Sequence, residues 1–192
     1  MNIEETTHSA GRKRAATTAP EKHAVVVDVP ARTAREGLVD FIKREQRFYT
    51  LSFNFLGGKK FWRHRLTSRS DIHSAILSGV PYGSLLFLVS QVKGLEEADV
   101  AKVLGISTRT LRRQSETPRR SMPADLASKT WLFAETLAKA TETFGGKEEA
   151  ERWMSKPAMG LNGQRPIDLL QTVQGAELVN DFLGRLEYGV YT

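Results

Sequence analysis

The chain has 192 residues, of which 40% are hydrophobic, and this is enough to bury a core in one medium domain or two small ones. It contains no cysteine, so disulfides, thiolate metal sites and cysteine nucleophiles are excluded. The net charge is +6 but unevenly spread: residues 1–80 carry 14 basic and 8 acidic side chains, residues 81–123 carry 7 and 4, and residues 124–192 carry 7 and 10. The basic and acidic parts are therefore expected to have different partners.

The beginning of the chain shows neither a signal sequence nor any run of about 20 apolar residues that could cross a bilayer. We therefore expect a cytoplasmic protein that does not associate with a membrane. Residues 1–35 lack apolar periodicity and are predicted to form a flexible basic arm. The cluster at residues 11–14, Gly-Arg-Lys-Arg, could contact phosphates, although a solvated tail is the stronger interpretation.

Helical spacing of apolar residues begins after this arm. A first helix is predicted around Leu38, Val39, Phe41 and Ile42, and it is broken at residues 57–58, Gly-Gly. A second helix is expected to begin at Ser70 or Asp71 and to end at Gly79, before Pro81. Ser84 is expected to cap a third, short helix over residues 85–89, whose apolar side chains on all sides place it in the core.

The strongest helical signal follows Pro123 and predicts one helix of about six turns that ends at residues 145–146, Gly-Gly. Shorter helices are predicted over residues 147–154 and 166–170, the latter with a proline in its first turn. Trp131 and Trp153 are expected in the core. A last helix carries the apolar stripe Leu178, Val179, Phe182, Leu183 and Leu186. Only residues 24–29 and 48–56 resemble strands, both ambiguously, so the predicted fold class is all-α.

Residues 96–114 have the spacing of a helix-turn-helix. Ala101 is small where two short helices would cross, and Gly105 allows the positive φ angle that the turn between them requires. Ser107 is well placed to cap the second helix. Gln114 stands where an apolar residue is common, so this second helix is expected to be short or loosely packed.

The second of these helices presents arginine and hydroxyl side chains. In a helix-turn-helix its first residues reach base edges in the major groove, where arginine suits guanine. An alternative is a plain corner between two helices with a solvated basic face, but the further arginines at 119 and 120, opposed only by Glu116, favour DNA binding. The predicted DNA-binding residues are Ser107, Thr108, Arg109, Thr110, Arg112 and Arg113.

Several separated motifs between residues 55 and 192 occur together in one order. They are Leu-Gly-Gly at 56–58, Ser-Gly-Val-Pro at 78–81, the helix-turn-helix, Phe-Gly-Gly-Lys-Glu-Glu-Ala-Glu-Arg-Trp at 144–153, Arg-Pro-Ile-Asp-Leu-Leu at 165–170, Gly175, and Arg-Leu-Glu-Tyr-Gly-Val-Tyr at 185–191. With these motifs the chain resembles the Xre antitoxins of Xre-RES toxin-antitoxin pairs. The resemblance does not extend to residues 1–54.

The resemblance implies a Cro/repressor-like helix-turn-helix domain, residues 36–123, followed by a small helical toxin-binding domain, residues 124–192. It implies a RES toxin, an enzyme that degrades NAD, as the protein partner, and a homodimer that reads an inverted repeat in its own promoter DNA. It also implies that the antitoxin covers the entrance of the toxin's active site. The residues assigned to toxin binding are Arg185, Tyr188, Gly189, Val190, Tyr191 and Thr192.

The end of the chain has two interpretations. Tyrosines suit an interface anchor because they bury a large area at a small entropic cost. From the residues alone, folding of Tyr188 and Tyr191 onto the chain's own core is favoured, whereas the resemblance favours contact with the toxin. Asp168 is assigned no contact role, since a carboxylate in a first helical turn also complements the helix dipole.

Enzyme functions find no support in the sequence. The four histidines (His8, His23, His64 and His73) include no metal-binding pair at i and i+4, and the chain lacks a phosphate-binding loop and a nucleophile elbow. We therefore expect no catalytic residue, no metal and no cofactor. The alternative to an antitoxin is a stand-alone transcriptional regulator whose C-terminal third only dimerises.

Overall fold

The computed structural model describes residues 31–62 and 66–187 of the chain. These residues form helices joined by turns, with two isolated bridges and no named strand among them. The predicted all-α fold class is confirmed for this part of the chain. The ambiguous strand at 48–56 lies almost wholly within the first helix, and residues 24–29 lie outside the described residues. In chain order the elements are α1 (Ala31–Phe55), η1 (Gly58–Lys60), α2 (Arg69–Ser78), α3 (Tyr82–Gln91), α4 (Glu97–Leu104), α5 (Thr108–Gln114), α6 (Ala124–Phe144), α7 (Lys147–Met154), η2 (Met159–Leu161), α8 (Pro166–Leu169) and α9 (Val173–Glu187).

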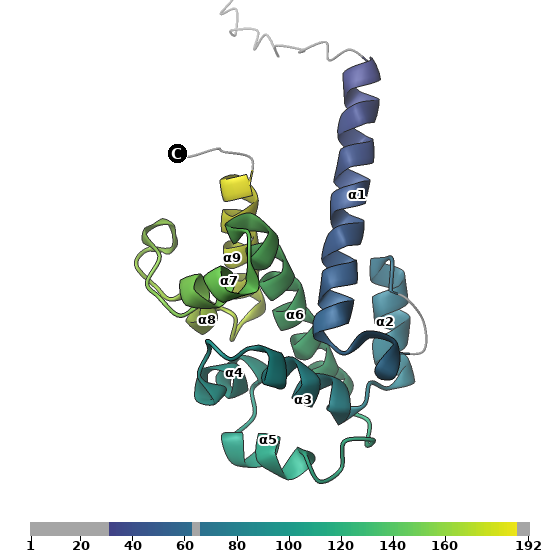
Figure 1. The fold of residues 1–192 in the computed structure, drawn as a ribbon, viewed down its shortest axis with the longest axis vertical. Coiled ribbons are helices and arrows are strands. Elements are labelled where there is room, and N and C mark those ends of the chain that lie inside the picture. Colours follow the sequence, from purple (N-terminus) through teal and green to yellow (C-terminus); the bar gives the residue numbers. More distant parts are fainter. Residues whose placement is uncertain (1–30, 63–65, 188–192) are drawn as a thin grey trace, which may run out of the picture.

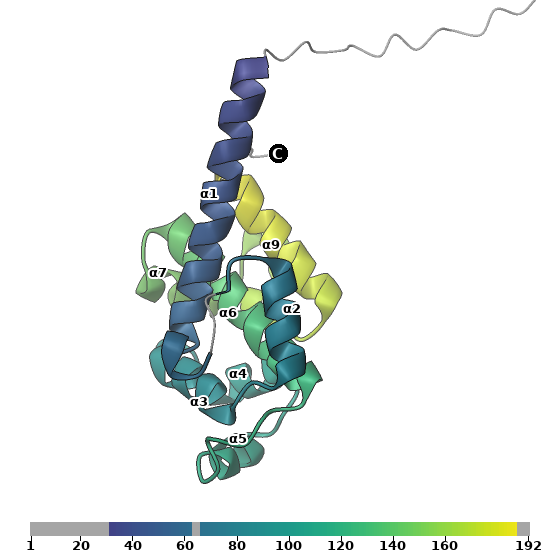
Figure 2. The same ribbon diagram turned by 90° about the vertical axis from the view of Figure 1, so that its right-hand side faces the viewer.

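Helix α6 is the centre of the fold. It packs against α1, α2, α3, α4, α7 and α9 (Figures 1 and 2). Its 21 residues agree with the predicted length of about six turns, and its inward face is fully buried at Phe133, Ala134 and Leu137. Buried residues from before and after Pro123 form one continuous hydrophobic cluster. The two predicted regions, 36–123 and 124–192, therefore share one core.

Helix α1 begins at Ala31, so the last five residues of the predicted arm are helical, while residues 1–30 lie outside the described residues. Its C-terminal half packs on α6, where the rings of Tyr49 and Trp131 lie 6.5 Å apart. Its N-terminal half projects beyond the other helices (Figures 1 and 2). The apolar residues that predicted this helix lie in that half and are exposed.

The third helix corrects one expectation. α3 begins at Tyr82 behind Pro81, three residues earlier than predicted, so Ser84 lies inside the helix and does not cap it. Ser84 is fully buried, its hydroxyl donates to the carbonyl of Leu56 at 2.8 Å, and it accepts a hydrogen bond from the indole of Trp62 at 3.0 Å. The serine therefore satisfies polar groups inside the core.

The remaining helices follow the predicted pattern closely. α2 begins one or two residues before the expected position, because Ser68 caps it by accepting from the backbone N–H of Asp71 at 3.1 Å. α7 has the predicted bounds, α8 carries its proline in the first turn, and α9 buries Val179 and Leu183. Along residues 31–62 and 66–187, none of the helices combines the length and the apolar character needed to cross a membrane.

Candidate nucleic-acid and partner-binding surfaces

Helices α4 and α5 are joined by a tight turn at Gly105. Gly105 has a φ of 69° and a ψ of 29°, a left-handed conformation that a residue with a β-carbon adopts only under strain. A β-carbon at this position would also come within 2.7 Å of the Lys129 ammonium nitrogen on α6. Ala101 is buried, and its carbonyl accepts from the N–H of Ile106 at 3.0 Å. The turn therefore has the geometry that the sequence predicted, and it is compatible with a helix-turn-helix.

Helix α5 is short and depends on α4 for its position. Ser107 caps it, as predicted, by accepting from the N–H of Thr110 at 3.0 Å. Leu111 and Gln114 are its buried residues, and α5 packs mainly against α4. Its seven residues make two turns, in agreement with the short second helix expected from Gln114.

The structure places five of the six predicted DNA-binding residues on α5, at an end of the molecule, and the sixth, Ser107, at the N-cap of that helix (Figure 1). Arg109, Arg112 and Arg113 are exposed, as are the neighbouring arginines at 119 and 120. Ser107 is exposed, and Thr108 and Thr110 are half-buried. Arg112 is 76% exposed, and its Nε also pairs with the Glu97 carboxylate on α4 at 3.0 Å.

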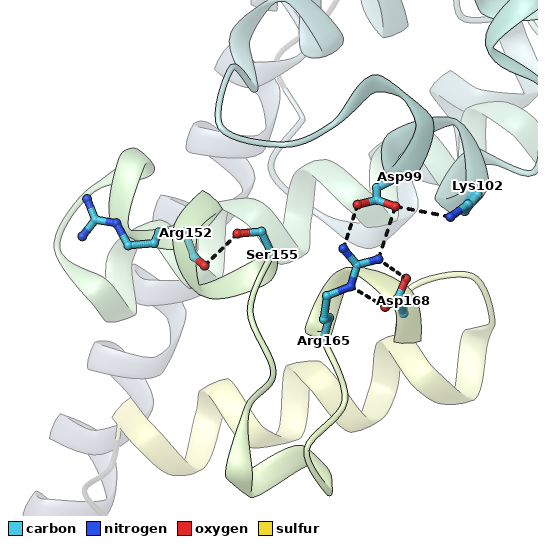
Figure 3. Close-up of polar contacts among 6 residues, drawn as sticks. All are labelled: Asp99, Lys102, Arg152, Ser155, Arg165 and Asp168. Atoms are coloured by element: carbon cyan, nitrogen blue, oxygen red, sulfur yellow. Dashed lines mark hydrogen bonds and ion pairs between the residues drawn. The ribbon is translucent and has the colours of Figure 1, made fainter.

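An ion-pair cluster joins α4 to α8 (Figure 3). The guanidinium of Arg165 donates to both oxygens of Asp99, at 3.0 and 3.3 Å, and to both oxygens of Asp168, at 2.7 and 2.8 Å. Asp99 is buried and also pairs with Lys102 at 3.4 Å. Hydrogen bonds from Arg165 lower the pKa of Asp168, and those to Asp168 and Asp99 raise the pKa of Arg165. In the same view Arg152 points away from the cluster.

A second polar contact joins α7 to the loop before α4. The buried carboxylate of Glu151 accepts from the N–H of Gly94 at 2.5 Å, and Lys147 donates to the carbonyl of Gln91, also at 2.5 Å. Lys147 and Glu151 further form an ion pair at 3.7 Å. The loop that leads into α4 is therefore held by α7, while α4 itself is held by α8.

The C-terminal helices share a column of three partly buried aromatic rings. The ring of Trp153 lies between Phe144, at 4.9 Å, and Phe182, with which it stacks at 6.2 Å. A β-carbon on Gly160 would run into the Phe182 ring, so η2 can approach α9 this closely only with glycine there. Trp131 is buried and Trp153 is half-buried against the core, which confirms both as core residues.

The predicted toxin-binding residues are only partly described. Arg185 is exposed on α9, with its guanidinium carbon 5.8 Å from the centre of the Phe182 ring. The other five, at 188–192, lie outside the described residues. Sequence reasoning missed Met159, which is 93% exposed on η2 beside α9. The sequence feature that could have identified Met159 is a methionine within a short loop rich in glycine and proline.

No group of side chains suited to a metal ion occurs within residues 31–62 and 66–187. His73 is exposed on α2, and the other three histidines lie outside these ranges. The sequence also missed the contact role of Asp168, although an arginine and an aspartate three residues apart across a helix start are a recognisable pairing signal.

Together these features define an all-helical protein in which a basic helix-turn-helix-like unit is fixed against a C-terminal helical domain. Comparison with known proteins identifies that domain, since residues 139–189 match the antitoxin Xre/MbcA/ParS C-terminal toxin-binding domain. The chain therefore carries the C-terminal domain described for the Xre/MbcA/ParS antitoxins, and the resemblance inferred from its motifs is confirmed.

Three relatives are all named antitoxin Xre. The protein of Yersinia enterocolitica is 35% identical over 99 residues, which are 51% of this chain and 66% of the relative. That of Photorhabdus laumondii is 30% identical over 49% of this chain and 64% of the relative, and that of Pseudomonas putida is 26% identical over 65% and 76%. The first two matches span just under two thirds of the relatives' own length. These names agree with the prediction that the chain is not an enzyme.

Proposed function

We propose that this chain is an antitoxin that binds and neutralises a toxin through its C-terminal helices. The observation that carries the proposal is the match of residues 139–189 to a toxin-binding domain. Exposed side chains on this domain supply a contact surface: Leu178 and Arg185 on one side of α9, and Met159 on the adjacent η2. Apolar anchors beside an arginine are typical of the centre of protein interfaces.

The toxin we propose is of the RES type, an NAD-degrading enzyme, and the antitoxin inhibits it by covering the entrance of its active site. Support for this comes from the resemblance of the sequence motifs to Xre-RES pairs. The tail at residues 188–192 is the proposed occluding segment, since it carries Tyr188 and Tyr191 beyond the end of α9. Such a tail would supply two aromatic anchors to the interface.

The second part of the proposal is autorepression. A homodimer would bind an inverted repeat in its own promoter through α5. The exposed arginines of α5, the capped start of that helix and the tight turn at Gly105 support this role. The high local density of positive charge predicts that the affinity for DNA falls as the salt concentration is raised.

Coexpression with the adjacent open reading frame tests the central claim. We expect the two products to copurify, and we expect the chain to rescue cells from growth arrest by the toxin. A deletion of residues 188–192 should abolish rescue if the tail occludes the active site. Full rescue by this truncation would reject the occluding tail while leaving the antitoxin role intact.

The alternative is a stand-alone transcriptional regulator, and it is favoured by the same exposed arginines of α5. It predicts operator binding without any protein partner. Gel shifts on the chain's own promoter across a salt series address the part that both functions share. If Arg109→Ala and Arg113→Ala change neither the affinity for promoter DNA nor its dependence on salt concentration, α5 is not the DNA-recognition helix.

A further inference from the structure

The N-terminal half of α1 carries apolar side chains that no other described element covers. Leu38 is 58% exposed, Val39 48%, Phe41 52% and Ile42 46%. We call these four residues the α1 stripe. They lie on the part of α1 that projects beyond the body of the molecule (Figures 1 and 2). A group of neighbouring, exposed apolar side chains is typical of an interaction surface.

The α1 stripe continues a face of the helix that is buried further along. Steps of three and four residues lead from Leu38 and Ile42 through Glu45 to Tyr49 and Phe53, and the last two are buried against the core. One continuous face is therefore covered in its C-terminal half and bare in its N-terminal half. A free helical segment of about 13 residues is marginal in water, so a partner on the bare half would stabilise it.

The α1 stripe adjoins the domain that matches the toxin-binding family. Arg44, on the turn after Ile42, pairs with Glu187 at the end of α9 at 3.0 Å, and the two side chains are 28% and 27% exposed. Arg47 lies 3.8 Å from Glu142 at the end of α6. Both acidic partners belong to the matched residues 139–189. The bare half of α1 and the end of α9 thus form neighbouring parts of one end of the molecule (Figure 1).

We propose that the α1 stripe is a second contact surface for the toxin. In this contact the exposed face of α1 binds in an apolar groove of the toxin. This inference rests on the proposed antitoxin function and adds a surface outside residues 139–189. The mode of contact is that of an amphipathic helix in a groove, with anchors at i, i+3 and i+4. Leu38, Phe41 and Ile42 have this spacing.

A second copy of the chain fits the α1 stripe less well. In a parallel, in-register pair, Glu45 of one copy would face Glu45 of the other, since it lies on the same helix face as Ile42. In an antiparallel pair, the two α5 helices would lie at opposite ends of the assembly, because α5 lies at the other end of the molecule from the bare half of α1 (Figure 1). The antiparallel arrangement therefore does not suit two adjacent DNA half-sites, and the parallel arrangement brings two like charges together.

The test compares the double variant Phe41→Gln, Ile42→Gln with the wild type and with the control Leu77→Gln. Glutamine keeps the helical propensity, and Leu77 is an exposed leucine on α2, away from the α1 stripe. The probe is the protein encoded by the adjacent open reading frame. We expect the double variant to bind it at least about tenfold more weakly, as for loss of interface anchors, and the control to bind as the wild type does. All three should keep the same midpoint of thermal unfolding.

Hydrogen exchange provides a second readout that needs no variant. We expect amides of residues 35–46 to gain protection when the adjacent gene's product is added. If the wild type binds this protein but the double variant binds equally well and the amides gain no protection, the inference is wrong and the proposed function stands. If the wild type does not bind at all, the proposed function fails and the inference with it. If the double variant turns a wild-type dimer into a monomer, the occupant is a second copy and the inference is overturned.

Discussion

At the scale of single residues, Ser84 is the polar side chain on which two buried groups depend. Its hydroxyl binds the Leu56 carbonyl and the Trp62 indole. We predict that Ser84→Ala lowers the free energy of unfolding by about 1–3 kcal/mol, because it leaves both groups without a partner in the core. Urea unfolding followed by tryptophan fluorescence measures this change.

The matched control is Ser90→Ala on the same helix. Ser90 is exposed, and its hydroxyl binds the carbonyl of Phe87 within the helix. Its replacement should change the free energy of unfolding by no more than about 0.5 kcal/mol. Equal effects of the two substitutions would show that the buried hydrogen bonds of Ser84 are not important for stability.

Asp168 links stability to pH. Hydrogen bonds from Arg165 lower the pKa of its carboxyl in the folded state, so the unfolded chain binds this proton more tightly than the folded chain does. The stabilisation is complete above the unfolded pKa of about 3.9 and is lost as pH falls through the lower folded pKa. Asp168→Asn should therefore be less stable than the wild type near neutral pH, and the difference should shrink as pH falls below about 4.

Urea unfolding of both proteins between pH 7 and pH 2.5 measures this difference. Its size at neutral pH should be modest, since the side chain of Asp168 is 40% exposed and water screens the pair. A difference of unchanged size at pH 2.5 would show that lost packing, not the charge of Asp168, explains the effect of the substitution.

At the scale of elements, the position of α5 depends on a chain of contacts that begins in the toxin-binding domain. α8 holds α4 through Arg165 and Asp99, α7 holds the loop before α4, and α5 packs mainly against α4. We predict that Arg165→Met weakens operator binding, although Arg165 lies at the start of α8 and not among the proposed DNA-binding residues. The substitution should also cost about 1–3 kcal/mol of stability, because Asp99 stays buried without its main partner.

Three further variants isolate this contact. Asp99→Asn combined with Arg165→Met should cost less than the sum of the two single changes, since each removes the same interaction. Lys102→Met should have a small effect, because Lys102 is 59% exposed and lies 3.4 Å from Asp99. Gel shifts and urea unfolding give the two readouts. Normal operator affinity in Arg165→Met, measured where the protein is fully folded, would show that α4 holds α5 without help from α8.

Helix positions were largely predictable from the sequence because apolar periodicity, glycine and proline report local geometry. The turn at Gly105, the cap at Ser107 and the bounds of α7 follow from a few neighbouring residues. Ser84 was misassigned because serine is suited to a cap and equally to a buried hydrogen bond, and the difference depends on Leu56 and Trp62, more than 20 residues away. The pairing of Arg165 with Asp99 spans 66 residues and had no local signal on the Asp99 side.

The exposure of the α1 stripe could not be predicted for a related reason. Helical spacing shows which side chains share a face, but the face is covered only as far as the neighbouring helices reach. Tyr49 is buried because Trp131 of α6 lies beside it, whereas no described element reaches Phe41. Which part of a long amphipathic helix finds a partner within its own chain is decided by tertiary packing.

At the scale of the whole molecule, the two proposed binding surfaces lie at opposite ends. α5 forms one end, and the α1 stripe with the end of α9 forms the other (Figures 1 and 2). One shared core lies between these two ends. Polar contacts from α7 and α8 further connect the C-terminal helices to α4 and to the loop before it. A toxin bound at one end would therefore leave the arginines of α5 open to solvent.

We predict on this basis that the antitoxin binds its operator and the toxin at the same time. Adding the adjacent gene's product to a preformed operator complex should give a slower band in a gel shift, and antibodies to either protein should shift that band further. The control is the double variant Arg109→Ala, Arg113→Ala, which should still bind the toxin but form neither DNA complex. Release of the operator by the toxin, with no slower band at any ratio, would mean that the two surfaces compete. That outcome would require toxin binding to move α4 through its contacts with α7 and α8, since the surfaces themselves do not overlap.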